Sequence, residues 1–365
     1  MLWELNLRKK IVIVGGGYAG VSLAHSLDEV AEVTLIEPRE AFFHCVAAIR
    51  AVVQPELLDR LIIPYDRLMK NGRIIQARAE QISEGRVVLE NGETIEGDCI
   101  IAATGSNYAP PFKAQSDLID DFRSHQAAAH AAVEAAQTII VVGAGPVGVE
   151  LAAEIKFAHP GKSISILAAS DEVVPGIASK LSKALQQQIA DMGINLQLGT
   201  PVAGMARTDA PFAGSLRARG KTYEADLIVP AFGAKPVIPP VECAAASASG
   251  RLEVDQWMRP CGYQAVFALG DAADNGDPMT IVAVRRQVSW LLKTIKKLID
   301  GKSVETLPAY TRATKPLLLV PLGRKKGTSI LPISRSGCLA GTWLTQKIKG
   351  KDLFLTDTRK ELGYT

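Results

Sequence analysis

Short apolar runs that end at glycine-rich turns recur along the 365-residue chain. Residues 10–14 (KIVIV) predict a buried strand, the turn GGGYAG follows at once, and residues 21–27 are compatible with a helix. Residues 33–36 (VTLI) then predict a second strand, which ends at Glu37. Strand, turn, helix and strand together form a complete βαβ unit at the start of the chain.

The same pattern returns about 128 residues later in the chain, counted from Gly15 to Gly143. Residues 138–142 (TIIVV) predict a strand, GAGPVG forms the turn, VELAAEIKF continues as a helix, and residues 164–167 predict the next strand. A duplication at this spacing indicates two similar domains rather than a short-period repeat. We therefore expect an α/β fold with two Rossmann-like dinucleotide-binding domains.

The remaining segments complete the outline. Residues 73–103 contain alternating strands with a hairpin turn at Asn91-Gly92, and the alanine-rich run 126–136 predicts a helix. Residues 236–265 are rich in Pro, Ala and Ser and favour loop with some strand. Residues 288–299 form an amphipathic helix, whose apolar stripe we expect to pack on the core rather than on a membrane.

Composition narrows the class of protein. Hydrophobic residues make up 47% and charged residues 22%, as in ordinary globular domains, and a net charge of +3 without a basic run indicates no nucleic-acid partner. No uncharged apolar stretch is long enough for a transmembrane helix, and residues 1–10 lack the apolar core of a signal peptide. The scattered cysteines Cys45, Cys99, Cys243, Cys261 and Cys338 predict no metal site and indicate a cytoplasmic-type compartment.

The first glycine-rich turn has the features of a dinucleotide site. Gly15 allows the tight turn, Gly17 lets the backbone approach a pyrophosphate, and Gly20 allows close packing of helix on strand. The helix N-terminus supplies N–H donors for the phosphates. Glu37, about 20 residues further on, is placed to bind a ribose hydroxyl.

The second turn repeats the glycines at Gly143, Gly145 and Gly148, with Glu150 two residues beyond. The position equivalent to Glu37 is Ala168 in this unit. No carboxylate there selects the ribose of NADH, and no adjacent arginine selects the 2′-phosphate of NADPH. The sequence therefore leaves the choice between NADH and NADPH open.

Two further motifs complete an ordered set, namely residues 103–106 (ATGS) and residues 267–271 (FALGD). In this order the motifs resemble those of the two-dinucleotide-binding, glutathione-reductase-like flavoproteins, over about residues 15–300. The resemblance implies that NADH or NADPH binds at the second glycine turn and Glu150. It implies that FAD is held by Gly15, Gly16, Gly17, Tyr18, Ala19, Gly20, Glu37, Thr104, Gly105, Gly270 and Asp271.

A narrower resemblance rests on residues 42–51 (FFHCVAAIRA) and 349–355 (KGKDLFL). Both segments are similar to the apoptosis-inducing-factor-like branch that includes the ferroptosis suppressor proteins. This resemblance implies that hydride passes from NAD(P)H through FAD to a small-molecule quinone-type acceptor. It further implies FAD contacts at Arg50 and Ala79, and roles in activity for Lys113, Glu150 and Lys349.

The chain departs from that branch at Leu2, where the N-myristoylation glycine is missing, at Ala168, where some members carry His, and at Cys45, which replaces Asn. Cys45 keeps a second function open, because coenzyme A disulfide reductases and NADH oxidases use one cysteine near the flavin. Those enzymes place it slightly further from the acidic residue and carry a larger C-terminal dimerisation domain. A third alternative, a non-catalytic nucleotide-binding redox sensor, is opposed by the intact glycines and Asp271.

We expect four segments along the chain. Residues 1–112 and 236–300 form the two parts of the FAD-binding domain, and residues 113–235 form the NAD(P)H-binding domain. Residues 301–365 form a small C-terminal α+β segment that contributes the acceptor site, a dimer contact or a membrane contact. Whether the protein forms a homodimer or touches a membrane surface peripherally stays open.

Overall fold

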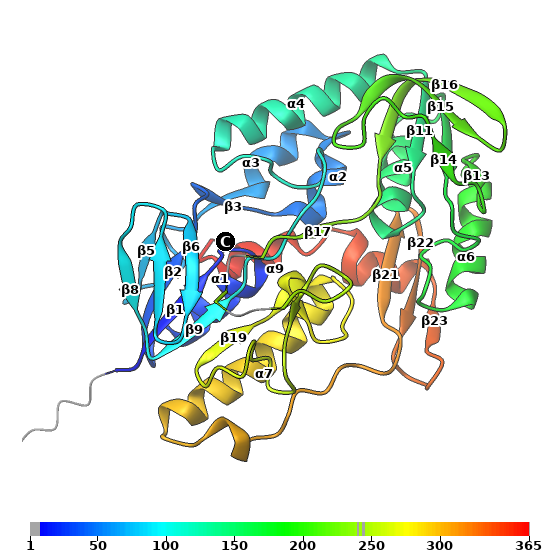
Figure 1. Cartoon of the computed structure of the whole chain (residues 1–365). Coiled ribbons are helices and arrows are strands. Elements are labelled where there is room, and N and C mark those ends of the chain that lie inside the picture. Colours follow the sequence, from blue (N-terminus) through cyan, green and yellow to red (C-terminus); the bar gives the residue numbers. More distant parts are fainter. Residues whose placement is uncertain (1–7, 239–240, 243–244, 365) are drawn as a thin grey trace, which may run out of the picture.

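The computed structural model describes residues 8–238, 241–242 and 245–364 (Figure 1). Two sequence interpretations, the missing signal peptide at the N-terminus and the reduced state of Cys243, involve residues outside this described part.

The first βαβ unit forms as expected, around a five-stranded parallel sheet with strand order β19-β9-β1-β2-β5. Its central strand β1 is flanked by β2 and β9, and helix α1 follows the turn, beginning three residues earlier than the pattern indicated. The bounds are β1 (Lys10–Val14), α1 (Tyr18–Leu27), β2 (Glu32–Ile36), β5 (Arg73–Ile75), β9 (Cys99–Ala102) and β19 (Val266–Ala268).

Both faces of this sheet are covered, which explains why its strands are continuously apolar. Ile11 and Ile13 of β1 pack in one core cluster with α1 and α7 (Ile281–Ile299), while Val12 packs in another with the antiparallel strands on the opposite face. Those strands are β6 (Ala79–Ser83), β7 (Arg86–Leu89) and β8 (Thr94–Glu96), and the predicted Asn91-Gly92 turn joins the last two. Leu291 of α7 is fully buried, so the predicted packing of this helix on the core is confirmed.

The second unit is a six-stranded sheet with strand order β13-β12-β11-β16-β15-β14. Helix α4 begins before the alanine-rich run, with Asp120 and Asp121 in its first turn, where carboxylates favour a helix N-terminus. The bounds are α4 (Ile119–Ala135), β11 (Thr138–Val142), α5 (Pro146–Ala158), β12 (Ser163–Leu167), α6 (Ser179–Asp191), β13 (Asn195–Gln197), β14 (Val202–Ala203), β15 (Phe212–Ala218) and β16 (Lys221–Pro230).

The C-terminal segment adds a three-stranded antiparallel sheet, β21 (Leu318–Leu322), β22 (Lys326–Leu331) and β23 (Cys338–Ala340), which shares the core of the second unit. After α8 (Thr342–Thr345) and the π-helical turn η5 (Gln346–Gly350), the chain runs back between the two units to α9 (Leu355–Glu361), beside α1 (Figure 1). The last segment therefore contacts both dinucleotide-binding units.

Short elements connect these parts. They are β3 (Ala41–Phe43), η1 (Cys45–Ala47), α2 (Ala48–Ala51), η2 (Pro55–Leu57), α3 (Leu58–Leu61), β4 (Ile62–Pro64), β10 (Ser106–Asn107), β17 (Lys235–Pro236), β18 (Leu252–Glu253), η3 (Gly270–Ala272), β20 (Ala273–Asp274) and η4 (Val304–Thr306). The described positions of residues 236–265 are mostly loop, in agreement with the sequence interpretation.

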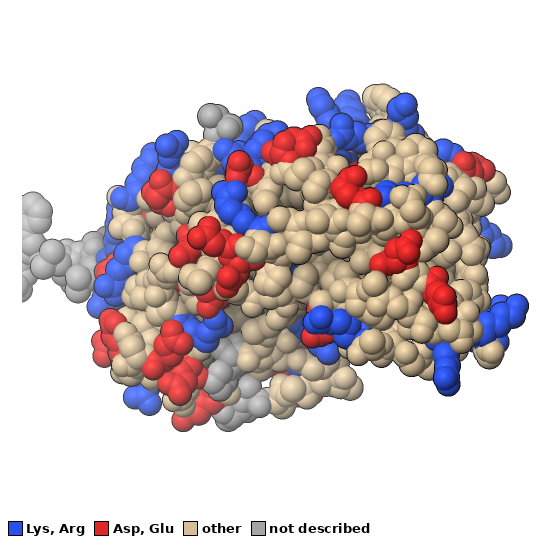
Figure 2. Space-filling model, turned by 90° about the horizontal axis from the view of Figure 1, so that it is seen from above, with Lys and Arg blue, Asp and Glu red and all other residues tan. Residues whose placement is uncertain are grey.

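Within the described ranges, none of the helices has the length and apolar character that crossing a bilayer requires. Figure 2 shows acidic and basic side chains interspersed over the face seen from above, with neither sign forming a continuous surface there.

Candidate active site

A cavity of about 1110 Å³ brings together both glycine turns and the C-terminal segment. Its volume lies near the upper end for a single small-ligand site, as expected where two dinucleotides meet. Most of the residues selected from the sequence line it, namely Gly15, Gly17, Tyr18, Ala19, Glu37, Ala79, Thr104, Gly105, Lys113, Gly143, Gly145, Glu150, Gly270, Asp271 and Lys349.

The first glycine turn has a backbone that only glycine accommodates. Gly15 has φ +108°, and a Cβ there would lie 2.5 Å from the carbonyl oxygen of Ala103. Gly20 does not line the cavity, because it packs α1 on the turn, where a Cβ would lie 1.8 Å from the Gly15 oxygen. A Cβ on Gly17 would meet open space.

The second turn repeats this geometry. Gly143 has φ +126°, and a Cβ there would lie 2.2 Å from the carbonyl oxygen of Ala231. Gly148 is a packing glycine outside the cavity lining, and Gly145, like Gly17, faces open space. Within the described part of the chain, no side chain caps the N-terminus of α1 or of α5, which leaves N–H groups of their first turns for a ligand. In α5 these donors begin after Pro146, because proline has no N–H. Two uncapped helix ends behind glycines with free space beside them fit the pyrophosphates of two dinucleotides.

Glu37 lines the cavity directly after β2, as the sequence predicted. One carboxylate oxygen accepts a hydrogen bond from the Gly16 N–H, and the other accepts bonds from the Arg39 Nε at 2.7 Å and backbone N–H at 3.0 Å. Burial raises the pKa of Glu37, but the Arg39 guanidinium and the backbone N–H groups of Arg39 and Gly16 together outweigh this effect, and the net pKa is lowered. The carboxylate is therefore held in its ionised, hydrogen-bond-accepting form beside the first glycine turn.

Lys113 and Asp271 meet at a second polar cluster in the cavity wall. The Lys113 ammonium donates to the Ser106 hydroxyl at 2.6 Å and lies 3.6 Å from the Asp271 carboxylate, which in turn accepts from the Ser106 hydroxyl. The structure therefore separates Lys113 from Glu150 and Lys349, the other two residues for which the sequence resemblance implies a role in activity.

Buried Glu150 and partly buried Lys349 form an ion pair that lines the cavity, with 2.6 Å between Nζ and Oε1. Glu150 belongs to α5, and Lys349 belongs to η5 and also donates to the Leu319 carbonyl at 3.2 Å. Burial raises the pKa of Glu150, and the Lys349 ammonium offsets part of that rise. The pair places a charge of each sign where the second unit meets the C-terminal segment.

Arg50 is not among the residues that line the cavity, and the FAD contact implied by the sequence resemblance stays a prediction. Its guanidinium is buried and pairs with Glu154 at 2.7 Å, where it also reaches main-chain carbonyls of the C-terminal segment. Gly16 is likewise not among the lining residues. Its N–H donates to the Glu37 carboxylate, and its carbonyl accepts from the Tyr65 hydroxyl.

Cys45 does line the cavity, next to Tyr18. The His44 Nε2 lies 2.8 Å from the Leu353 carbonyl, which can only accept, so Nδ1 is the acceptor for the Tyr18 hydroxyl at 3.1 Å. The Tyr18 oxygen then accepts from the Cys45 thiol at 3.7 Å and from the Val46 N–H. Burial lowers the pKa of His44 to about 4, so this ring is neutral near pH 7.

Several residues in and around the site were not identified from the sequence. Glu154 follows Glu150 by one helical turn, and this i, i+4 spacing on a helix was an available signal. Arg39 lies two residues after Glu37, a spacing that carries no general signal of pairing. Phe232 and Met279 add exposed apolar surface to the cavity lining.

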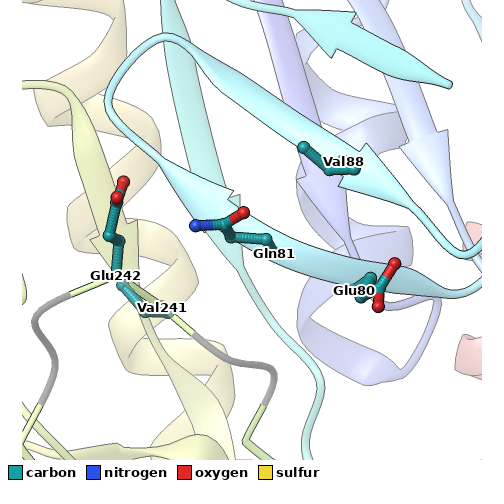
Figure 3. Close-up of a pocket in the computed structure, with 5 residues that line it drawn as sticks. All are labelled: Glu80, Gln81, Val88, Val241 and Glu242. Atoms are coloured by element: carbon teal, nitrogen blue, oxygen red, sulfur yellow. The ribbon is translucent and has the colours of Figure 1, made fainter. Parts of the chain in front are cut away.

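A smaller hollow lies apart from this chemistry, between the outer edge of the β6–β7 hairpin and residues 241–242 (Figure 3). It is lined by Glu80, Gln81, Val88, Val241 and Glu242 and contains neither glycine turn. The large cavity is therefore the candidate active site.

Two dinucleotide cradles that open into one cavity define a two-dinucleotide-binding-domain flavoprotein oxidoreductase. The chain belongs to the pyridine nucleotide-disulphide oxidoreductase family, which it matches over residues 9–287. It is an FAD-dependent pyridine nucleotide oxidoreductase, and its cofactors are FAD and NAD(P)H.

The sequence resemblance to the apoptosis-inducing-factor-like branch is confirmed. The chain is 31% identical to apoptosis-inducing factor homolog B of Dictyostelium discoideum over 95% of each chain. It is 29% identical to ferroptosis suppressor protein 1 of Taeniopygia guttata, over 98% of this chain and 96% of the relative. The fold is similar to the sulfide:quinone oxidoreductase of Aquifex aeolicus, with a TM-score of 0.72, 16% identity, and coverage of 96% and 90%.

Proposed function

We propose that the electron acceptor is a quinone and that the protein acts as an NAD(P)H:quinone oxidoreductase. The observation that carries this proposal is an apolar part of the cavity wall. There Met279, just before α7, and Ile281 and Val282, at its start, line the same space as residues 317–319 and Phe354. A quinone ring with an apolar tail suits such a wall. The quinone named for the structurally similar Aquifex aeolicus enzyme agrees with this choice.

Bound FAD would supply the two-electron chemistry, accepting electrons from the reduced nicotinamide and passing them on to the acceptor. The residues of the chain then bind, orient and exclude water. We assign the Gly15 and Gly17 turn, Glu37 and the Lys113–Asp271 cluster to FAD, and the Gly143 and Gly145 turn to NAD(P)H. Glu150 and Lys349 line the cavity where the second unit meets the C-terminal segment, and there they orient the nicotinamide end of the nucleotide.

The contacts of Cys45 favour this proposal over the single-cysteine alternative. A reactive thiolate needs a nearby cation or hydrogen-bond donor. Tyr18 instead accepts a bond from the thiol and gives its own proton to His44, which is neutral near pH 7. In this arrangement the Cys45 thiol acts as a hydrogen-bond donor, and within the described residues no side chain donates a hydrogen bond to its sulfur.

Stopped-flow absorbance of the flavin tests the proposal. The protein is first reduced with NADH or NADPH, and then mixed with a short-chain ubiquinone or, separately, with coenzyme A disulfide or peroxide. We expect fast reoxidation by the quinone, unchanged in Cys45→Ser. Reoxidation only by the disulfide or the peroxide, lost in Cys45→Ser, would establish the thiol enzyme instead.

A matched pair of variants tests the apolar wall. Met279→Asn places an amide in the cavity wall, whereas Ile333→Asn changes an exposed residue outside it. Losing about 1 kcal/mol of apolar contact should raise the quinone KM roughly fivefold in the first variant only, with unchanged flavin reduction by NADH. An equal KM for quinone in both variants would contradict the placement.

Contact with a membrane surface and homodimer formation stay predictions. Ile333, Leu339, Trp343 and Ile348 expose apolar side chains on the C-terminal segment, and the Lys347 ammonium lies over the Trp343 ring. Such a combination of aromatic and cationic groups suits a lipid headgroup region. Sedimentation with anionic lipid vesicles and measurement of the mass in solution would test the two predictions separately.

A further inference from the structure

Arg50 and Glu154 form a second buried ion pair close to that of Glu150 and Lys349. Both side chains are 4% exposed, and the Glu154 Oε1 accepts from the Arg50 Nη2 at 2.7 Å and Nε at 3.1 Å. Arg50 belongs to α2, in the first unit, whereas Glu154 belongs to α5, in the second. A buried pair of this kind is a costly way to join two elements, since each charge loses its hydration.

The guanidinium also holds the main chain directly after Lys349. Its Nη2 donates to the Gly350 carbonyl at 2.8 Å, and its Nη1 donates to the Lys351 carbonyl at 3.2 Å. These carbonyls lie at the end of the π-helical turn, where a helix leaves acceptors without main-chain partners. Arg50 therefore fixes the backbone from which the Lys349 side chain extends.

The two carboxylates share one face of α5, because Glu154 follows Glu150 by one turn. Each receives a cation from outside the helix, Glu150 from Lys349 and Glu154 from Arg50. A lysine has a flexible stem and a single point charge, so the position of its ammonium depends on how firmly its backbone is held. Arg50 supplies that support from the first unit.

We propose that Arg50 and Glu154 are positioning residues for flavin reduction, which act by holding the Lys349 ammonium against Glu150 at the cavity wall. The inference rests on the proposed function insofar as Glu150 and Lys349 orient the nicotinamide nucleotide. It gives Arg50 an indirect role on the side of the nicotinamide nucleotide.

The first test separates FAD binding from flavin reduction in Arg50→Met, which keeps an unbranched stem but removes the charge and the guanidinium donors. We expect the apoprotein to bind FAD within about threefold of wild type, because Arg50 does not line the cavity. Flavin reduction by NADH should slow by about 10- to 100-fold, as expected when a reacting group shifts by about 1 Å. Loss of FAD affinity with normal reduction of the flavin that remains bound would overturn the proposal.

The pH profile of flavin reduction supplies a readout that a purely structural role would not move. The Arg50 charge lowers the pKa of Glu150 and the Glu154 charge raises it. The acid limb of the profile should therefore move to higher pH in Arg50→Met and to lower pH in Glu154→Gln. The double variant, which restores the charge balance and serves if either single variant fails to fold, should return the limb toward wild type. An acid limb that stays in place in both single variants, or that moves in the same direction in both, would contradict the proposal.

A double-mutant cycle with Lys349→Met distinguishes the role of Lys349 from the positioning role of Arg50. If Arg50 acts through Lys349, then Arg50→Met should add no further slowing to Lys349→Met, and additive losses would contradict this. Wild-type flavin reduction in Lys349→Met alone would instead overturn the proposed role of Lys349. Slow reduction in Lys349→Met with normal rates in Arg50→Met and Glu154→Gln would overturn only the positioning role.

Discussion

The two dinucleotide-binding units share one backbone arrangement at the glycine turn and differ in the residues after their second strands. In each, the first glycine lies at positive φ against a carbonyl at the end of a neighbouring strand, that of Ala103 after β9 in the first unit and of Ala231 after β16 in the second. In each unit the glycine turn and the helix N-terminus together are sufficient to form a phosphate site, independently of the residues after the second strand.

The residues after the second strand set the units apart. Glu37 in the first unit is a buried carboxylate held by Arg39 and Gly16, whereas the second unit has the small side chains Ala168, Ala169 and Ser170 at the cavity. A fixed anion that can accept from ribose hydroxyls suits a cofactor that stays bound. Small side chains suit a nucleotide that must enter and leave in each cycle. Four predictions test this contrast.

The largest effect is expected from a carboxylate placed in either cradle. Gly17→Asp and Gly145→Asp should both fold, because neither glycine has positive φ and a Cβ there meets open space. Each carboxylate faces the phosphates, and like charges brought together cost several kcal/mol, so binding should fall about 1000-fold. Gly17→Asp should lose FAD, whereas Gly145→Asp should keep FAD but lose reduction by NAD(P)H. Gly161→Asp, on an unobstructed surface turn, is the control and should leave both nucleotides bound. Loss of FAD in both Gly17→Asp and Gly145→Asp would contradict the assignment of the two turns to different nucleotides.

Acid should weaken the first unit through His44, which holds the Leu353 carbonyl of the C-terminal segment. Burial lowers its pKa from 6.5 to about 4, so between these values the unfolded chain binds a proton that the folded chain does not. The free energy of unfolding should therefore fall as the pH drops from about 6.5 to about 4, by at most about 3 kcal/mol from this residue. Urea unfolding of wild type and His44→Gln across this range measures the difference. Parallel pH dependence in the two proteins would show that His44 contributes nothing.

Local patterns predicted the fold well, because strands, glycine turns and helices depend on neighbouring residues. Both βαβ units and the Asn91-Gly92 hairpin were confirmed on that basis. The site was harder to predict, since its contacts join distant segments. The Arg50 guanidinium and the Gly350 carbonyl are 300 residues apart, and no local pattern links them. The resemblance selected Arg50 as a residue of interest, but it did not indicate the protein partners that the structure gives it, Glu154 and the main chain after Lys349.

Exchanging the residues after the second strands should alter affinity more modestly. Glu37→Gln keeps the shape but leaves the Arg39 guanidinium without its charged partner, so FAD affinity should fall about tenfold, as for one charged hydrogen bond. Ala168→Glu introduces the missing carboxylate into the second unit, where it should repel the 2′-phosphate and favour NADH over NADPH about tenfold. Titration of the apoprotein with FAD, and flavin reduction rates with both nucleotides, measure these changes. An unchanged NADH to NADPH ratio in Ala168→Glu would mean that the adenosine ribose does not lie beside residue 168.

The smallest expected effect concerns the segment from Lys113 to Asp117, which lines the cavity beside the first unit and is joined to it by an ion pair between Arg78 and Asp117. Both partners are largely exposed, so the pair contributes at most about 1 kcal/mol, or roughly a fivefold change in rate. If this segment covers bound FAD, Arg78→Ala should release FAD up to about fivefold faster, with less effect at high salt than at low salt. Arg123→Ala removes a comparable exposed ion pair, with Asp59, away from the cavity and should leave the release rate unchanged. The rise in FAD fluorescence after dilution measures both variants. Faster release in both would assign the effect to general loosening of the fold, whereas faster release in Arg78→Ala alone would show that the first unit retains its cofactor by closure as well as by the Glu37 carboxylate.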